Sequence, residues 1–216
     1  MTSTLAPNGC IGVAVPWGNV TTQVEMDRLR PDDVVNVIGH FDLGPDWPEH
    51  VMDACRHLLA FDPLVVLVGL HPELTGNLGV LRTAVQAADL DVPVVLAVDA
   101  VLDRLSSLGL RRASVLTPGG TEQAERVAAV FAERDIVVVN HVGMERGLGN
   151  IGNAPLELVE AALREADHPD SEAVVQLGTN LPALSPARAL SDELGKPVIS
   201  ANGVLYAAAL HTCGLS

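Results

Sequence analysis

The stretch Val174–Leu184, VVQLGTNLPAL, joins an apolar strand to a polar strand end. The pattern predicts a buried strand at Ala173–Leu177 that stops at Gly178, Thr179 and Asn180, just before the next helix begins. A strand, a small polar loop and a helix in this order are typical of open parallel sheets, where ligands bind beyond the carboxyl ends of the strands. None of the three loop residues is a strong nucleophile or base, so a reactive group would have to come from another part of the chain.

The same alternation of short apolar strands and helical patterns runs along the whole chain. The predicted strands are Ile11–Val15, Val34–Ile38, Leu64–Val68, Pro93–Val98, Ala113–Leu116, Ile136–Val139, Ala173–Leu177 and Pro197–Ser200. The predicted helices are Thr22–Leu29, Pro48–Ala60, Leu78–Ala88, Val101–Leu108, Thr121–Arg134, Pro155–Ala166, Pro186–Leu194 and Val204–His211. This alternation predicts an α/β fold with parallel sheets covered by helices on both faces.

The two halves of the chain resemble each other. GVAVPWGN aligns with ASVLTPGGT, which places Pro16 opposite Pro118, and DVPVVLAVDAVL aligns with GKPVISANGVL. VVLVGLHPEL aligns in the same way with AVVQLGTNLPAL, and the offset stays between 102 and 109 residues. We therefore predict two pseudo-symmetric lobes, each with a parallel sheet flanked by helices. Residues 1–100, with a contribution from the C-terminal helix, would form the first lobe, and residues 101–216 the second.

Two facing lobes would bring four strand ends together in one active-site cleft. The loops that would line this cleft are Pro16–Thr22, Gly69–Glu73, Pro118–Thr121 and Gly178–Asn180.

Composition and charge limit the partners of the chain. A net charge of −14 argues against nucleic acid, whose phosphates need a basic surface, but it leaves room for a small anion in a local pocket of N–H groups. No apolar run reaches the roughly 20 residues of a membrane span, and MTSTLAPNGC has no signal-peptide pattern, so we expect a cytoplasmic protein that does not contact membranes. A homodimer is the expected oligomer on frequency alone.

No cofactor or metal is expected. Cys10, Cys55 and Cys213 are too scattered for a metal site or a disulfide framework, and Cys55 lies in an apolar helical pattern typical of a buried residue. GLGNIG, residues 147–152, matches the dinucleotide pattern G-x-G-x-x-G, but it begins eight residues after Val139 instead of at the end of the strand.

Three stretches carry a family resemblance over nearly the whole chain. They are IGVAVPWGNVTTQVEM, SVLTPGGTEQAERVAAVFAERDIVVV, and GTNLPAL followed by LGKPVISANGVL. In order and spacing they resemble the aspartate/glutamate racemase superfamily, nearest to the branch of maleate cis–trans isomerase and arylmalonate decarboxylase. The resemblance implies a two-lobed α/β fold and a cofactor-independent site in which two cysteines, one per lobe, face each other.

This chain departs from the family pattern at both cysteine positions. The second-lobe cysteine normally begins a Cys-Thr-Asn triplet, which here is Gly178-Thr179-Asn180. The first-lobe position is occupied by Leu70, or by Gly69 if the alignment shifts by one residue. Glycine and leucine cannot ionise, so the usual two-thiol route is not available. A tyrosine that commonly follows the proline at 118 is also replaced, by Gly119.

Two residues could move protons in place of the thiols. His71 and Glu73 directly follow the lost first-lobe cysteine, and either an imidazole or a tuned carboxylate can act as a general acid or base. The alternative interpretation is that both lie in an ordinary surface loop.

Amide and hydroxyl side chains follow the predicted strands. We expect Asn19, Thr121, Thr179 and Asn180 to bind a carboxylate or an oxyanion together with backbone N–H groups, although plain helix capping would use the same residue types. Trp17, Gly18 and Gly178 would complete the substrate-binding surface, with Trp17 either forming a pocket wall or packing on the opposite lobe. His141 and Glu145 are weaker candidates at the cleft rim, as is His40.

The sequence therefore favours a cofactor-independent isomerase or lyase acting on a small carboxylate or carbonyl compound through an enolate-like intermediate. One alternative is a hydrolase or hydratase whose water is activated by His71 or Glu73. The other is a non-catalytic relative that binds a carboxylate.

Overall fold

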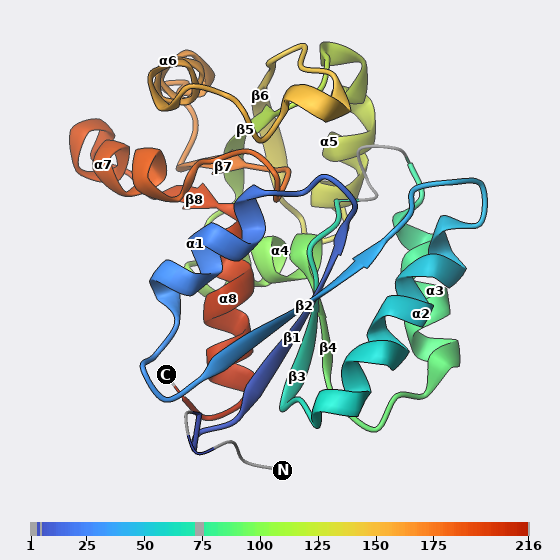
Figure 1. Cartoon of the computed structure of the whole chain (residues 1–216). Helices are drawn as coiled ribbons and strands as arrows, with labels where there is room; N and C mark the ends of the chain where they lie inside the picture. Colours follow the sequence, from blue (N-terminus) through green and yellow to red (C-terminus); the bar gives the residue numbers. More distant parts are fainter. Residues whose placement is uncertain (1–3, 5, 72–75, 216) are drawn as a thin grey trace.

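The computed structural model describes residues 4, 6–71 and 76–215, and they form two four-stranded parallel sheets (Figure 1). The first sheet has the order β2-β1-β3-β4 and the second has the order β6-β5-β7-β8. The predicted α/β class with two flanked parallel sheets is confirmed. The two sheets share one strand order; the two-fold relation between the lobes and the division near residue 100 stay predictions.

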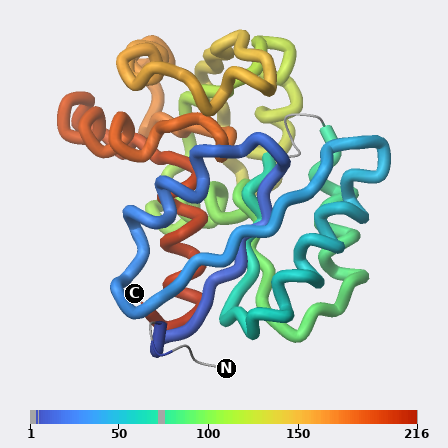
Figure 2. The backbone as a smooth tube through the Cα atoms, viewed as in Figure 1, coloured from blue at the N-terminus to red at the C-terminus, as the bar shows by residue number. Residues whose placement is uncertain are grey.

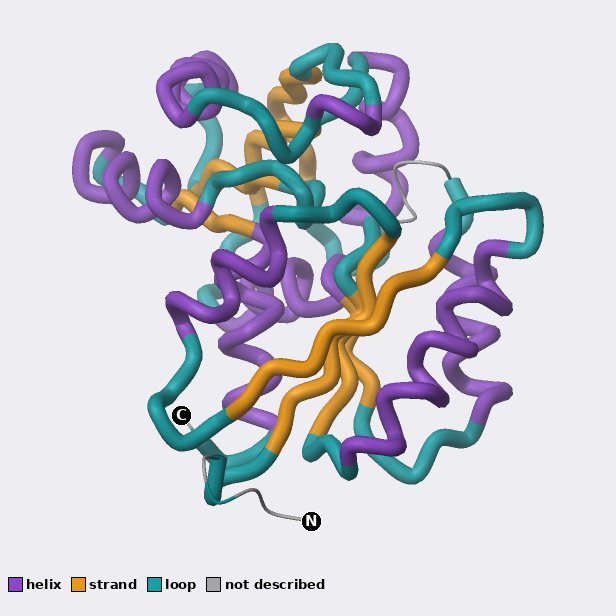
Figure 3. Tube along the Cα trace, viewed as in Figure 1, coloured by secondary structure: helices purple, strands orange, loops and turns teal. Residues whose placement is uncertain are grey.

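The first sheet contains β1 (Cys10–Pro16), β2 (Val35–Phe41), β3 (Val65–Val68) and β4 (Val94–Leu96). Helix α1 (Thr21–Leu29) lies on one side of it, and α2 (Trp47–Leu58) and α3 (Leu78–Ala88) lie on the other (Figure 3). A 3-10 turn, η1 (Leu59–Phe61), follows α2. β1 and β3 are buried on both faces, as their unbroken apolar sequences predict.

The second sheet contains β5 (Arg112–Thr117), β6 (Val137–Gly143), β7 (Ala173–Gln176) and β8 (Val198–Ser200). Its helices are α5 (Ala124–Ala132), α6 (Leu156–Ala166) and α7 (Leu184–Leu194), with 3-10 turns η3 (Thr121–Gln123) and η4 (Leu148–Asn150). β2 and β6, the outer strands next to β1 and β5, run beyond their predicted ends to Phe41 and Gly143.

Two helices cross between the sheets. α4 (Ala97–Ser107) follows β4 but packs Val101 and Leu105 in one core cluster with Val115 of the second sheet. α8 (Ala201–Thr212) follows β8 but packs Leu205 and Tyr206 against the first sheet, so that the end of α8 lies near the start of β1 (Figure 2). This exchange ties the lobes together through buried apolar surface, which fixes how their strand ends face each other.

The prediction that a strand spans Pro93–Val98 is wrong at its end. The strand stops at Leu96, and Ala97 and Val98 already belong to α4. An unbroken apolar run cannot distinguish a buried strand from the buried start of a helix by periodicity. Asp99 in the first turn supports the helix, because a carboxylate there meets the positive end of the helix dipole.

Candidate active site

Three of the predicted loops meet where the lobes touch. The Asn19 Nδ2 atom after β1 donates to Thr179 Oγ1 after β7 at 3.2 Å. The Thr179 hydroxyl in turn donates to the carbonyl oxygen of Gly69 after β3 at 2.7 Å. Asn19 and Thr179 are both buried, so these bonds are formed away from bulk water.

Asn180 holds the first-lobe loop through a second set of hydrogen bonds. Its Oδ1 atom accepts from the N–H groups of Val20 and Thr21 at 3.0 and 3.3 Å, and its Nδ2 atom donates to Gly18 O at 3.3 Å. The Thr21 hydroxyl donates to the Asn180 carbonyl at 2.7 Å. Three of the predicted donors, Asn19, Thr179 and Asn180, are thus engaged in hydrogen bonds across the lobe contact. A ligand would replace these bonds or use the remaining N–H groups.

A deeper polar layer supports these loops, and sequence reasoning missed it. Glu25 on α1 is 5% exposed and accepts hydrogen bonds from the Leu184 N–H and from Asn202 Nδ2, both at 2.8 Å. Asn202 also donates to Thr179 O at 2.8 Å, and the Thr22 hydroxyl donates to the same oxygen at 3.0 Å. The signal in the sequence was Glu25 itself, which lies on the same buried face of α1 as Thr22.

Burial raises the pKa of the Glu25 carboxyl above its ordinary value, while the hydrogen bonds from Leu184 and Asn202 act in the opposite direction. Because its folded-state pKa is the higher one, the folded protein keeps this proton where the unfolded chain loses it. The contribution of Glu25 to stability is therefore largest below the ordinary glutamate pKa, about 4.3, and falls as pH rises through the folded-state value.

We expect Glu25→Gln to remove this pH dependence. Glutamine is neutral and similar in shape, so its contribution does not change with pH. The free energy of unfolding of the variant minus that of wild type should therefore increase as pH rises from about 4 to about 7. Urea denaturation at several pH values measures this difference, with Glu157→Gln on the exposed side of α6 as the control. A difference that does not change with pH would contradict the prediction.

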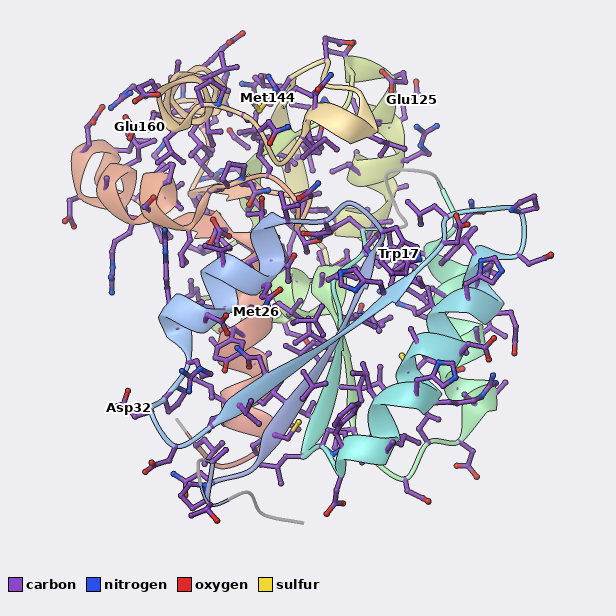
Figure 4. The ribbon with its side chains drawn as sticks, viewed as in Figure 1. Trp17, Met26, Asp32, Glu125, Met144 and Glu160 are labelled. Carbon is purple, nitrogen blue, oxygen red and sulfur yellow. The ribbon has the colours of Figure 1, made fainter. Side chains whose placement is uncertain are left out.

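Trp17 lies at the end of β1 that faces the second lobe (Figure 4), and the expectation that it packs on that lobe is wrong. Its ring stacks on His40 of β2 in its own lobe, with ring centroids 4.7 Å apart, and the residue is 70% exposed. Its role as a wall of the substrate pocket stays a prediction. Gly18 adopts a φ of +82°, which allows the chain to turn between Trp17 and Asn19.

The second-lobe side of the site contains more titratable groups. The Thr121 N–H donates to Glu145 Oε1 at 3.3 Å, and Thr117 Oγ1 lies 3.0 Å from His141 Nε2. His141 belongs to β6 itself and does not follow it as predicted. Burial lowers the pKa of His141, and Glu122 acts in the opposite direction, so the balance favours a neutral ring.

His71 is 4% exposed, so the interpretation as a surface histidine is wrong. It lies two residues beyond Gly69, whose carbonyl oxygen binds Thr179. Glu73 falls outside the described residues, and the catalytic roles of both residues stay predictions.

Comparison with known proteins supports the fold assignment. No family model matches the chain. The maleate isomerase of Alcaligenes faecalis is 25% identical over 155 residues, a match that covers 69% of this chain and only 60% of that protein. The solved maleate cis–trans isomerase of Nocardia farcinica, bound to Tris, superimposes with a TM-score of 0.83 at 21% identity, covering 96% of this chain and 93% of that one. The chain has the maleate isomerase fold.

Arylmalonate decarboxylase shares this fold. A liganded mutant of it, with one glycine changed to cysteine and one cysteine to serine, superimposes with a TM-score of 0.82 at 23% identity, covering 95% of this chain and 93% of that one. The resemblance inferred from the three sequence stretches, to the maleate isomerase and arylmalonate decarboxylase branch of the racemase superfamily, is therefore confirmed. A cysteine-to-serine mutant of the Nocardia enzyme, TM-score 0.78, carries a covalently bound succinylcysteine intermediate.

The sequence resemblance aligns Gly178 with the second-lobe cysteine, and a larger residue could not easily replace this glycine. Gly178 has a φ of +95°, and a Cβ atom there would lie 2.7 Å from Pro118 Cγ. A Cβ atom on Gly69 would lie 2.9 Å from Val15 Cγ1. Both distances are shorter than van der Waals contact, so neither position has room for a side chain unless its neighbours move.

The three cysteines lie elsewhere in the fold. Cys10 begins β1 at the end away from the site, Cys55 is buried inside α2 as predicted, and Cys213 follows α8. Burial raises the pKa of all three thiols, that of Cys55 to about 12, which keeps them protonated near neutral pH.

Among the described residues, no three His, Cys, Asp or Glu side chains are grouped so that they could hold a metal ion. None of the described helices has the length and apolar character that crossing a membrane requires.

Proposed function

We propose that the chain is a cofactor-independent enzyme of the isomerase or lyase type that acts on a small carboxylate through an enolate-like intermediate. One observation carries the proposal: Asn19, Thr179 and the backbone of Gly69 join three strand ends at the lobe contact, two residues from the buried His71. The relatives that share the fold are isomerases and a decarboxylase, which supports this class of reaction.

The binding groups suit a developing negative charge on oxygen. Within the described part of the chain, the N–H groups of Thr179 and Asn180 donate to no protein acceptor, and they follow directly on Gly178, which has a φ of +95°. Fixed N–H donors at a strand end, together with the Asn19 amide, can stabilise an oxyanion in a site with little water. These groups bind and orient the carboxylate, while His71 or Glu73 exchanges the proton.

The proposed reaction begins when the His71 imidazole takes a proton from the carbon next to the carboxylate. The electron pair of the C–H bond moves towards the carboxylate oxygens, which gives an enediolate held by the N–H donors. Return of the proton to that carbon or to another carbon completes an isomerisation. In a lyase variant the His71 ring is protonated at the start: the C–C bond to a second carboxylate breaks, CO₂ leaves, and the electron pair of that bond gives the same enediolate. The imidazolium then gives its proton to the carbon.

Proton exchange with solvent tests this proposal. A panel of small carboxylates with a hydrogen on the adjacent carbon is incubated with the protein in D₂O and followed by proton NMR. We expect protein-dependent loss of that signal for at least one compound. A compound that raises the melting temperature without exchange or product would instead indicate a binding protein, and ¹⁸O uptake from labelled water would indicate a hydratase or hydrolase.

A further inference from the structure

The Glu145 carboxylate lies over the loop that follows β5. Besides its hydrogen bond from the Thr121 N–H, its Oε2 atom lies 2.9 Å from the position that a Cβ atom on Gly120 would take. Glycine at position 120 therefore leaves the space that this carboxylate needs. The second-lobe loop thus already carries an anionic group that belongs to the protein.

Backbone contacts fix Glu145 in this place. Its N–H donates to Gly119 O at 3.0 Å, and the next N–H along the chain donates to Pro118 O at 2.9 Å. β6 approaches the same loop so closely at Gly143 that a Cβ atom there would lie 2.6 Å from the backbone of Gly120. Glu145 itself has a φ of +53°, an uncommon conformation for a residue with a side chain.

A second carboxylate adds to the negative charge here. Glu122 Oε2 approaches the same Cβ position over Gly120 as Glu145 does. Within the described ranges, neither glutamate forms an ion pair, and the nearby Arg146 directs its Nε atom to Asn150 O at 2.8 Å. Both glutamates are exposed, so each adds negative charge to this loop on the second-lobe side.

The first-lobe side of the site differs in charge. There the loop N–H groups of Val20 and Thr21 are bound by the amide oxygen of Asn180, which is neutral. A ligand carboxylate can approach this side without charge repulsion, but a second carboxylate directed at Gly120 would meet Glu145.

We propose that Glu145 is a specificity-determining residue that excludes substrates with a second carboxylate on the second-lobe side. The inference rests on the proposed function and narrows it. The substrate then directs no carboxylate at the second-lobe side, and the group that it places there is uncharged or donates hydrogen bonds. Dicarboxylates such as the maleate of the structural relatives would be poor ligands for this chain.

Succinate and its monoamide, succinamate, test this inference by isothermal titration calorimetry. The two probes have nearly the same shape and differ by one carboxylate. We expect wild type to bind succinamate more tightly than succinate, and Glu145→Gln to reduce that preference by roughly 3- to 30-fold while leaving the affinity for succinamate unchanged. Glu157→Gln on α6 makes the same change in net charge at an exposed distant position and should keep the wild-type preference.

The outcomes separate the two proposals, because binding of these probes does not require turnover. Equal binding of both probes to wild type, or a preference that Glu145→Gln leaves unchanged, would overturn the role of Glu145 alone. Failure of every variant to bind either probe would overturn the carboxylate site of the proposed function, and this inference with it.

Discussion

Replacement of His71 by glutamine is expected to lower the turnover number by about 10²- to 10⁴-fold, the usual loss when a positioned general acid or base is removed. Glutamine occupies a similar volume and still forms hydrogen bonds, but it cannot exchange a proton near neutral pH. Alanine is less suitable, because His71 is buried and a cavity would lower stability as well as activity. Steady-state kinetics and the melting temperature of the same preparations measure the two effects separately.

His57→Gln on the exposed side of α2 is the matched control and should leave turnover unchanged. Glu73→Gln tests the alternative base. If Glu73→Gln abolishes turnover and His71→Gln keeps it, proton transfer belongs to Glu73. If both variants remain fully active, neither residue is the base and the proposed mechanism is wrong.

Asn19→Ala is expected to lower the turnover number by about 10²- to 10³-fold, because it removes an amide donor from the proposed oxyanion site. The change also removes the acceptor for the Thr22 N–H at 3.1 Å and the hydrogen bond to Thr179. Loss of these buried partners should lower the free energy of unfolding by about 1–3 kcal/mol. Kinetics with a saturating substrate and urea denaturation measure the two losses.

Comparison with Thr22→Val shows whether Asn19 contacts the ligand or only stabilises the contact between the lobes. Valine has the same shape but loses the hydroxyl that donates to Thr179 O in the deeper layer. We expect a stability loss similar to that of Asn19→Ala, with most of the turnover kept. Equal losses of turnover in both variants would show that Asn19 acts only as a structural residue.

Much of the fold could be predicted because its signals are local. β1, β3, β5 and β7 are short apolar runs that end in Gly, Pro, Thr or Asn, and parallel topology then places all four ends at one edge. The contact between Asn19 and Thr179 follows from that topology once the two halves of the chain are aligned. Sequence does not fix a boundary where an apolar run passes from strand to helix, as at Ala97.

The side-chain chemistry of the site could not be predicted in the same way. Glu25 and Asn202 are 177 residues apart and meet only because α8 crosses back to the first lobe. Glu145 was considered a rim residue, yet its place over Gly120 depends on backbone hydrogen bonds between two loops. The hydrogen bonds that Asn19, Thr179 and Asn180 form across the lobe contact are likewise a property of the assembled lobes and not of any one motif.

The glycines in the second-lobe loops account for several of these features together. Without a side chain at Gly178, Pro118 approaches the backbone closely, and Gly120 leaves room for a carboxylate that the protein supplies itself. We propose that the binding part of the site is retained, while proton transfer passes to His71 or Glu73 after β3. Under this proposal the binding loops keep the family arrangement, while the groups that transfer the proton differ from the family pattern.

The central claim is that proton transfer in this fold proceeds here without a thiol. The most direct test is solvent deuterium exchange by a variant in which Cys10, Cys55 and Cys213 are all replaced by alanine, with circular dichroism to confirm that it is folded. The claim predicts the same exchange rate at the substrate carbon as in wild type. A folded cysteine-free variant that no longer exchanges the proton would contradict it.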